Sequence, residues 1–340
     1  MLTNKEIEAR LLPPTGKIKV VLDTDAFNEV DDQFEITWAL TRTDRLDIQA
    51  IYAAPFYNGR VSSPKEGMQR SYKEIFTLLE KAGVPKDKYP VFHGSTDYLP
   101  SDNTPVASDA ADDLIKRAMS MGDEPLYVVA TGAITTVASA LLKEPKIADK
   151  IVILWLGGQP LDWSTAFEFN LSQDKLAVKD ILQTQVPFIL IPCMSVASEL
   201  VTTNYELDHY LEGTSKSGEY LRKVVSDFIN NVNKENGDGG IATLTTETGD
   251  PYLRDLSDYD ESKYANEPSA VAKSKIIWDI STVAFLVNPL WTKSSLVSAP
   301  ILTDDETWQA TTDQHPIRVV RHLDRDAIFG DLFTRIKALP

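Results

Sequence analysis

Lys17-Ile18-Lys19-Val20-Val21-Leu22 runs directly into Asp23-Thr24-Asp25, and a second acidic pair, Asp31-Asp32, follows after a short turn. Residues 17–22 are mostly apolar and β-branched, which predicts a buried strand. Residues 33–40 (QFEITWAL) have the spacing of a helix. The carboxylates therefore stand where a strand gives way to a helix, and open α/β sheets bind their ligands at this end of their strands.

This acidic cluster favours a metal site. Carboxylates that are ionised side by side repel, and the usual remedy is a hard divalent cation with oxygen ligands, Ca²⁺ or Mg²⁺. Asp31 and Asp32 alone would also suit the N-terminus of a helix, where negative charge is favoured. That alternative does not explain why Asp23 and Asp25 close the preceding strand.

The first two thirds of the chain alternate between strand-like and helix-like runs. Nearly continuous apolar strands of this kind are typical of a parallel sheet that is buried on both faces. We therefore predict an α/β fold with a mostly parallel central sheet flanked by helices. The expected strands are 17–22, 48–54, 90–93, 125–131, 150–156 and 186–192, and the expected helices are 33–40, 64–82, 107–121, 134–142 and 174–183.

The last third is less regular. We expect helices at 215–232, 276–287 and 326–339, strands at 296–303 and 317–323, and a long loop at 237–264. The sequence shows no repeat, low-complexity tract or linker. We therefore expect residues 1–340 to form a single domain.

Composition narrows the partners. The formal net charge is −16, and no basic stripe is present, so no nucleic-acid partner is expected. Much of the acidity lies in residues 235–267. The polar start and the absence of a long apolar run predict neither a signal peptide nor a membrane span. The single cysteine, Cys193, excludes a disulfide framework, favours a cytoplasmic location and is expected to be a buried, inert thiol.

Three further sites follow other strand-like or apolar runs. Thr131-Gly132 ends a strand, where glycine allows close approach of the backbone and free carbonyls can bind a cation. Glu168-Phe169-Asn170 offers a carboxylate and an amide to hydroxyl groups. Trp278-Asp279 lies in an otherwise apolar run, where a lone aspartate is costly unless it is paired, binds a metal or caps a helix.

Together these motifs resemble the nucleoside hydrolase family of the inosine–uridine type. The strand followed by Asp23-Thr24-Asp25 and then Asp31-Asp32 matches the family's opening signature. Its later strand-end motifs resemble residues 131–136 and Leu156-Gly157-Gly158, its EFN motif is present as residues 168–170, and its late HD pair is similar to residues 278–279. The order and spacing of these motifs run from about residue 17 to residue 289.

The resemblance implies hydrolysis of the N-glycosidic bond of a ribonucleoside or related riboside. It implies one Ca²⁺ held by Asp25, Asp32, the main-chain carbonyl of Thr131, and Asp279, with Asp25 also the general base that takes a proton from a water. Asp31, Glu168 and Asn170 would hold ribose hydroxyls. The expected partner is a small nucleoside, and a homo-oligomer, dimer or tetramer, is expected.

This sequence departs from the family pattern in three places. The turn at residues 26–30 is two residues longer than usual, so Asn28 or Glu29 enters the pocket or lies at the surface, and Asn28 is retained as a substrate-binding candidate. Thr136 stands where the family usually has asparagine, which we interpret as structural. Trp278 replaces the histidine thought to protonate the leaving base, and its ring is a candidate for stacking on that base.

Other aromatic and histidine residues are weaker candidates. Tyr57, Trp163 and Phe167 are expected in the core rather than in the site. His93 ends a strand and is a candidate to face the pocket. The remaining histidines match no family position and are expected at the surface or satisfied structurally: His209, His315 and His322.

Two other functions remain open at this stage. A non-catalytic or divergent member of the same fold would bind ribosides or sugars without cleaving them, and the lost histidine favours that alternative while the retained Asp25 opposes it. The strand that ends in Asp23-Thr24-Asp25 also resembles Mg²⁺-dependent phosphatases of the haloacid dehalogenase type. The threonine that those enzymes carry after the motif is absent here.

Overall fold

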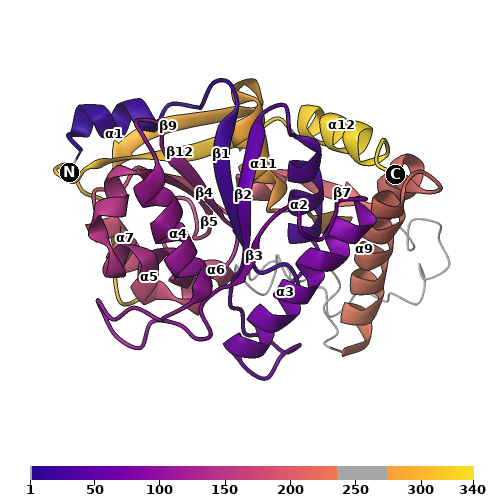
Figure 1. Cartoon of the computed structure of the whole chain (residues 1–340), viewed down its shortest axis with the longest axis horizontal. Coiled ribbons are helices and arrows are strands. Elements are labelled where there is room, and N and C mark those ends of the chain that lie inside the picture. Colours follow the sequence, from indigo (N-terminus) through magenta and orange to yellow (C-terminus); the bar gives the residue numbers. More distant parts are fainter. Residues whose placement is uncertain (1, 236–273) are drawn as a thin grey trace, which may run out of the picture.

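The computed structural model describes residues 2–235 and 274–340 (Figure 1). Eight strands form the central sheet in the order β3-β2-β1-β4-β5-β6-β12-β9. Seven are parallel and β9, at one edge, is antiparallel to β12. The predicted mostly parallel sheet is therefore confirmed. Its strands are β1 (Ile18–Thr24), β2 (Leu46–Ala53), β3 (Val91–His93), β4 (Leu126–Ala130), β5 (Ile151–Leu156), β6 (Phe188–Ile191), β9 (Thr292–Ser298) and β12 (Pro316–Leu323).

Helices cover both faces of this sheet, and each set of helices packs on its own apolar core (Figure 1). One face carries α4 (Asp109–Ser120), α5 (Thr135–Lys143) and α7 (Lys175–Gln183). The other face carries α2 (Asp32–Thr41), α3 (Pro64–Lys81), α9 (Lys216–Glu235), α11 (Ile280–Val287) and α12 (Arg325–Ile336). The strands are buried on both faces, which explains their continuous apolar runs.

Smaller elements complete the described residues. They include α1 (Asn4–Arg10), α6 (Phe169–Gln173), α8 (Asn204–Leu211) and the 3-10 helices η1 (Pro145–Asp149), η2 (Ala197–Glu199) and η6 (Pro289–Trp291). Two small antiparallel sheets pair β7 (Val201–Thr203) with β8 (Ser274–Ile276), and β10 (Ile301–Leu302) with β11 (Trp308–Gln309).

Two expectations for the last third are wrong. The helix expected at 276–287 begins only at Ile280, because residues 274–276 pair with β7 as a strand. The strand expected at 296–303 is two strands in different sheets, β9 and β10. The loop expected at 237–264 and most of the acidic stretch 235–267 lie outside the described residues.

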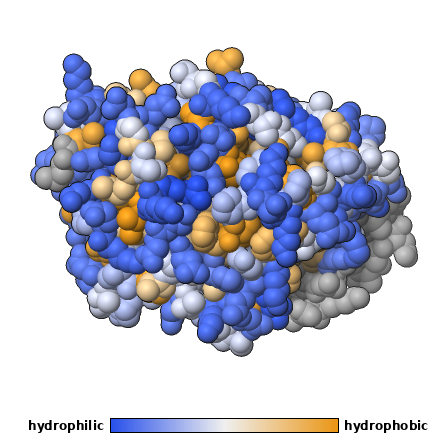
Figure 2. Space-filling view, viewed as in Figure 1, coloured by the Kyte–Doolittle hydropathy of each residue, from blue (hydrophilic) through white to orange (hydrophobic). Residues whose placement is uncertain are grey.

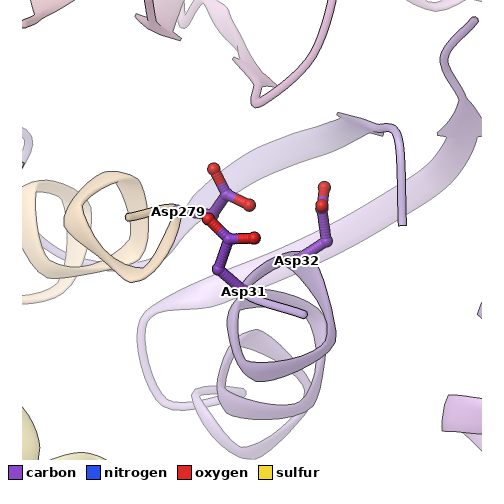
Figure 3. A group of neighbouring side chains, drawn as sticks. All are labelled: Asp31, Asp32 and Asp279. Atoms are coloured by element: carbon purple, nitrogen blue, oxygen red, sulfur yellow. The ribbon is translucent and has the colours of Figure 1, made fainter. Parts of the chain in front are cut away.

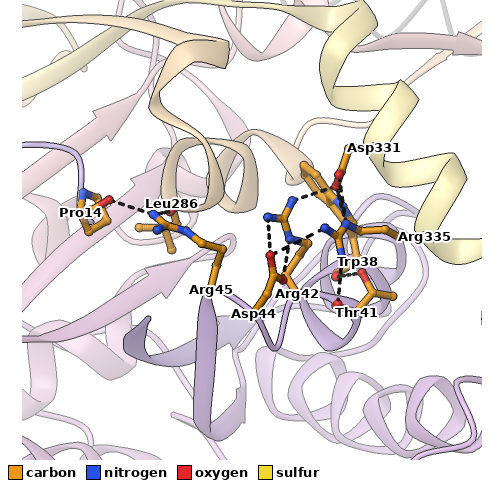
Figure 4. Close-up of polar contacts among 9 residues, drawn as sticks. All are labelled: Pro14, Trp38, Thr41, Arg42, Asp44, Arg45, Leu286, Asp331 and Arg335. Carbon is orange, nitrogen blue, oxygen red and sulfur yellow. Dashed lines mark hydrogen bonds and ion pairs between the residues drawn. The ribbon is translucent and has the colours of Figure 1, made fainter. Parts of the chain in front are cut away.

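A buried network of ionic contacts fixes α2, the helix that begins at the acidic pair (Figure 4). Asp331 of α12 accepts hydrogen bonds from Trp38 Nε1 and Arg42 Nη1, both at 2.9 Å, and from Arg335 Nε at 3.0 Å. Arg45 donates to the main-chain oxygens of Pro14 and Leu286. These contacts join the C-terminal end of α2 to α12, and the residues just after α2 to α11.

The face of the molecule seen in Figure 2 is predominantly hydrophilic, with small scattered apolar patches. Among the described residues, no helix combines the length and the apolar character needed to span a bilayer. Cys193 is buried, as expected, and its thiol hydrogen-bonds Glu168.

Candidate active site

Strand β1 delivers two aspartates to the middle of the sheet. Asp23 pairs in register with Tyr52 of β2 and Ala130 of β4, so its backbone lies between two neighbouring strands in the middle of the sheet. Asp25 follows directly after the strand. Both residues are 1% exposed, and Asp23 Oδ1 and Asp25 Oδ2 have no hydrogen-bond partner among the described residues. Buried carboxylate oxygens without a partner are costly, which points to a ligand at this position.

Asp31 and Asp32 open helix α2 beside this strand end. Asp31 occupies the N-cap position of α2, but its side chain makes no capping hydrogen bond. Asp32 instead accepts hydrogen bonds from the hydroxyl groups of Thr24 and Thr131, at 2.5 and 3.3 Å. The Asp32 carboxylate at the start of α2 is therefore hydrogen-bonded to residues at the ends of β1 and β4.

Asp279 joins them from the other end of the chain. One carboxylate oxygen each of Asp31, Asp32 and Asp279 lies within 4.8 Å of the others. Figure 3 shows the first two at the start of α2 and Asp279 beside the start of α11, with the Asp31 and Asp279 carboxyl groups turned toward each other. Asp279 occupies the N-cap position of α11, but its side chain makes no capping hydrogen bond. Helix capping therefore does not account for the direction in which its carboxyl group points.

The electrostatics of the cluster favour a cation. Burial raises the pKa of Asp25 well above its usual range, and the neighbouring charges of Asp32 and Asp31 raise it further. Burial also raises the pKa of Asp279, and the charges of Asp31 and Asp32 add to the shift. A hard divalent cation would remove this repulsion, and carboxylate and carbonyl oxygens are its preferred ligands.

The Thr131-Gly132 strand end packs tightly against Asp25. A Cβ atom on Gly132 would lie 3.0 Å from Asp25 Cγ and 3.2 Å from Asp25 Oδ2, so a larger residue there would require Asp25 to shift. The Thr131 main-chain oxygen accepts a hydrogen bond from Asn170 Nδ2 at 3.2 Å. The same amide donates to Leu156 O at 3.1 Å, so it joins the ends of β4 and β5.

Glu168 is held by main-chain amides. Its carboxylate accepts hydrogen bonds from the amides of Gly158, Asn170 and Leu171 at 2.8, 3.0 and 3.1 Å, which makes it the N-cap of α6. Burial nevertheless raises the pKa of Glu168. The carboxylate thus fixes the EFN motif beside the strand ends, and its contact with ribose stays a prediction.

The long turn at residues 26–30 is held by hydrogen bonds to residues 58 and 60 and by an ion pair with Lys275. Asn28 is buried, its Oδ1 accepts a hydrogen bond from Asn58 Nδ2 at 2.7 Å, and Arg60 donates to the main-chain oxygens of Phe27 and Asn28. On the inner side, Glu29 forms an ion pair with Lys275 of β8.

Several aromatic and histidine residues differ from expectation. Tyr57 and Phe167 are 50% and 48% exposed, so the expectation that they lie in the core is wrong. Both lie in loops, Tyr57 between β2 and α3 and Phe167 between β5 and α6. Trp163 and Trp278 are half-buried, and Trp278 packs against the core on the α2 face. His93 stacks on Tyr72, with 3.8 Å between ring centroids.

The histidines that match no family motif lie in three different environments. His209 is exposed and His322 contacts Glu199, as expected. His315 is buried and its Nε2 atom has no partner among the described residues, so the expectation that it is exposed or satisfied is wrong.

Three residues at the site escaped the sequence motifs. Glu35 lies one helical turn beyond the acidic pair, is fully buried, and accepts hydrogen bonds from Thr131 Oγ1 and Thr282 Oγ1, both at 3.1 Å. Tyr98 is close enough to Asp25 that, after burial, the Asp25 charge raises the pKa of the phenol. The third residue is Lys275, which forms the ion pair with Glu29. Of these three residues, only Glu35 had a local signal in the sequence, namely its position after an acidic pair.

Comparisons with known proteins identify the family of this chain and the fold that it shares. The family model described as inosine-uridine preferring nucleoside hydrolase matches residues 20–330. The pyrimidine-specific ribonucleoside hydrolase RihA of Escherichia coli O1:K1 / APEC is 25% identical over 192 residues, which is 51% of this chain and 59% of RihA. The match thus spans less than two thirds of that relative.

Solved structures share the fold along almost the whole chain. The plant nucleoside hydrolase PpNRh1 has a TM-score of 0.67 at 21% identity, covering 94% of this chain and 99% of its own. The purine-preferring ribonucleoside hydrolase from Gardnerella vaginalis has a TM-score of 0.67 at 19% identity, covering 94% and 98%. With a family model that matches most of its length, this chain belongs to the family of inosine-uridine preferring nucleoside hydrolases.

Proposed function

We propose that this protein hydrolyses the N-glycosidic bond of a ribonucleoside or a closely related riboside, with a Ca²⁺-bound water as the nucleophile. The observation that carries the proposal is the buried set of carboxylates at the ends of β1 and at the starts of α2 and α11. Family membership supports the reaction class. RihA acts on pyrimidine ribonucleosides and the Gardnerella enzyme prefers purine ribonucleosides, and we leave the base open between these two classes.

The residues present suit a calcium ion. Asp25, Asp32, Asp279 and the main-chain oxygen of Thr131 would hold it, since all four offer hard oxygen atoms at one edge of the sheet. Asp31 lies in the same cluster and is a further candidate ligand, in addition to its proposed contact with ribose. When bound, such an ion lowers the pKa of a coordinated water.

The chain's own residues would then complete the reaction. Asp25 accepts a proton from the attacking water, whose oxygen forms a bond to the anomeric carbon. The C–N bond breaks, and the departing base takes the bonding electrons and a proton from solvent or from an acid not yet identified. The surrounding carboxylates stabilise the positive charge that develops on the sugar. Asp31, Asn28, Glu168 and Asn170 would orient the ribose hydroxyls, and Trp278 would contact the base.

A riboside-binding protein without catalysis is the second candidate. The observation that favours it is Trp278 in the position of the family's histidine, since an indole cannot donate a proton as an acid near neutral pH. The phosphatase alternative loses its basis, because the nucleoside hydrolase family model matches residues 20–330 of this chain. We also propose a cytoplasmic location and a homo-oligomer, dimer or tetramer, as the sequence predicts.

The decisive experiment is a panel of purine and pyrimidine nucleosides incubated with the purified protein, before and after chelation and with Ca²⁺ restored. Released base and reducing sugar should appear with at least one nucleoside, should disappear on chelation and should return with Ca²⁺. Tight riboside binding without release of sugar would establish the second candidate instead. Release of sugar that persists after complete removal of metal would contradict the proposed role of Ca²⁺.

A further inference from the structure

The residues around the acidic cluster include a buried basic residue that none of the motifs predicts. The Lys275 side chain is 6% exposed, and its ammonium group forms an ion pair with Glu29, whose side chain is 28% exposed. The same ammonium lies 5.4 Å from the centroid of the Phe228 ring on α9. A lysine is seldom buried to this degree unless it is paired, so the contact with Glu29 is the reason that it is tolerated.

Lys275 also acts on the acidic cluster itself. Burial raises the pKa of Asp31 to about 7, and the positive charge of Lys275 opposes that rise. Burial lowers the pKa of Lys275, but the charges of Glu29, Asp31 and Asp279 raise it above its usual value. The lysine is therefore charged at neutral pH.

The chain positions of the two partners explain how they reach the cluster. Glu29 belongs to the turn at residues 26–30, two residues before Asp31. Lys275 lies on β8, four residues before Asp279. The ion pair therefore joins the two segments that supply the cluster, from positions 246 residues apart in sequence.

We propose that Lys275 and Glu29 are a built-in counter-charge pair that sets the cation affinity of the acidic cluster. Lys275 offsets part of the negative charge that attracts a divalent cation, and Glu29 restores it. Neither residue needs to touch the cation, because unit charges several ångströms away act strongly in a buried site. The inference rests on the proposed metal site and adds residues that the metal ligands do not include.

Four proteins test this proposal: the wild type, Lys275→Met, Glu29→Gln and the double variant. Each is stripped of metal, its folding is checked by thermal unfolding, and Ca²⁺ alone is titrated by calorimetry. Lys275→Met adds one net negative charge and should bind Ca²⁺ about tenfold more tightly, whereas Glu29→Gln removes one and should bind about tenfold more weakly. The double variant keeps the net charge and should return to within about threefold of the wild type.

A merely structural ion pair would give a different order. Both single variants would then bind Ca²⁺ more weakly, and the double variant would not recover, which would overturn the counter-charge proposal even if the wild type binds Ca²⁺ and cleaves nucleosides. Equal affinities in all four proteins would overturn it as well. If only Lys275→Met binds Ca²⁺, the counter-charge proposal is supported, but the proposal that the wild type uses Ca²⁺ is contradicted. If none of the four proteins binds Ca²⁺, both proposals are overturned.

The control is Lys143→Met. Lys143 pairs with Asp112 between α5 and α4, on the opposite face of the sheet, so this variant makes the same change in net charge far from the cluster. Its Ca²⁺ affinity should equal that of the wild type. A tenfold change in the control would assign the effect to overall charge and overturn the local role of Lys275.

Discussion

The side-chain amide of Asn170 donates a hydrogen bond to the main-chain oxygen of Thr131, 3.2 Å away, and a second one to Leu156 O. Two family motifs that lie far apart in sequence thus meet at one atom, the carbonyl proposed to bind the cation. A carbonyl oxygen has two lone pairs, so it can accept this hydrogen bond and still act as a ligand. Asn170 is therefore expected to orient the Thr131 carbonyl as well as to contact sugar.

Asn170→Asp tests this second role. The substitution keeps the shape of the side chain but sets a carboxylate against two carbonyl oxygens, so the Thr131 carbonyl should turn and Ca²⁺ affinity should fall about tenfold or more. Calcium titration measures the effect independently of catalysis. An Asn170→Asp protein that loses activity but keeps wild-type Ca²⁺ affinity would limit Asn170 to sugar binding.

Asp25→Asn tests the proposed base. Turnover should fall by about 10²–10⁴-fold, because a positioned general base contributes on that scale. The matched control is Asp47→Asn, at a half-buried aspartate on β2 away from the cluster, which should leave turnover unchanged. Near-full activity of Asp25→Asn, measured as released reducing sugar, would remove Asp25 from the mechanism.

Gly132→Ala tests the close contact behind Asp25. The new methyl group would lie 3.0 Å from Asp25 Cγ, so the carboxylate must move, and turnover should fall about 10- to 100-fold. Gly122→Ala is the control, since a Cβ atom there meets nothing within 4 Å. Equal turnover in both variants would show that Asp25 tolerates displacement.

Trp278→Ala tests the proposed contact with the base. If the half-buried ring stacks on the base, substrate binding or turnover should weaken by about 1–3 kcal/mol, and nucleosides with good leaving groups should be cleaved faster than inosine or uridine. Trp278→Phe retains a stacking ring and should recover most of the loss. Equal loss in both variants, together with a lowered melting temperature, would indicate a packing role instead.

His315 predicts a pH dependence of stability. Burial lowers its pKa below the ordinary 6.5, so below that pH the unfolded chain binds more protons than the folded one. The free energy of unfolding should therefore fall more steeply, as pH drops below 6.5, in the wild type than in His315→Gln. Exposed His209→Gln should follow the wild type. Denaturant unfolding at a series of pH values provides the comparison, and parallel curves for wild type and His315→Gln would contradict it.

Asp331→Ala tests the network that fixes α2 (Figure 4). It leaves Arg42, whose side chain is 7% exposed, without one of its two ionic partners, and it removes the acceptor of Trp38. We expect a loss of about 1–3 kcal/mol in the free energy of unfolding. Asp326→Ala breaks a surface pair at a 91% exposed carboxylate and should cost less than about 1 kcal/mol. Similar losses in the two variants would mean that the Asp331 network stabilises the fold no more than an exposed ion pair does.

The strands and the acidic motifs at their ends were predictable because they depend on local patterns. Continuous apolar runs identify strands buried on both faces, and an aspartate directly after such a run must lie at a sheet edge. The boundary at Ile280 was not predictable. Residues 276–278 are as apolar as the helix that follows, so the sequence gives no sign of a boundary. Residues 274–276 form a strand only because they pair with β7.

By itself, the sequence determined that several carboxylates lie at the carboxyl ends of a parallel sheet, and that the motifs around them resemble one family. Only the tertiary structure decided which carboxylates meet, that the Asn170 amide is engaged by two carbonyls, and that Lys275 is buried against Glu29. The physical reason is distance along the chain. Periodicity and motif spacing report on neighbours within a turn or a strand, whereas the Lys275–Glu29 contact depends on packing between segments 246 residues apart.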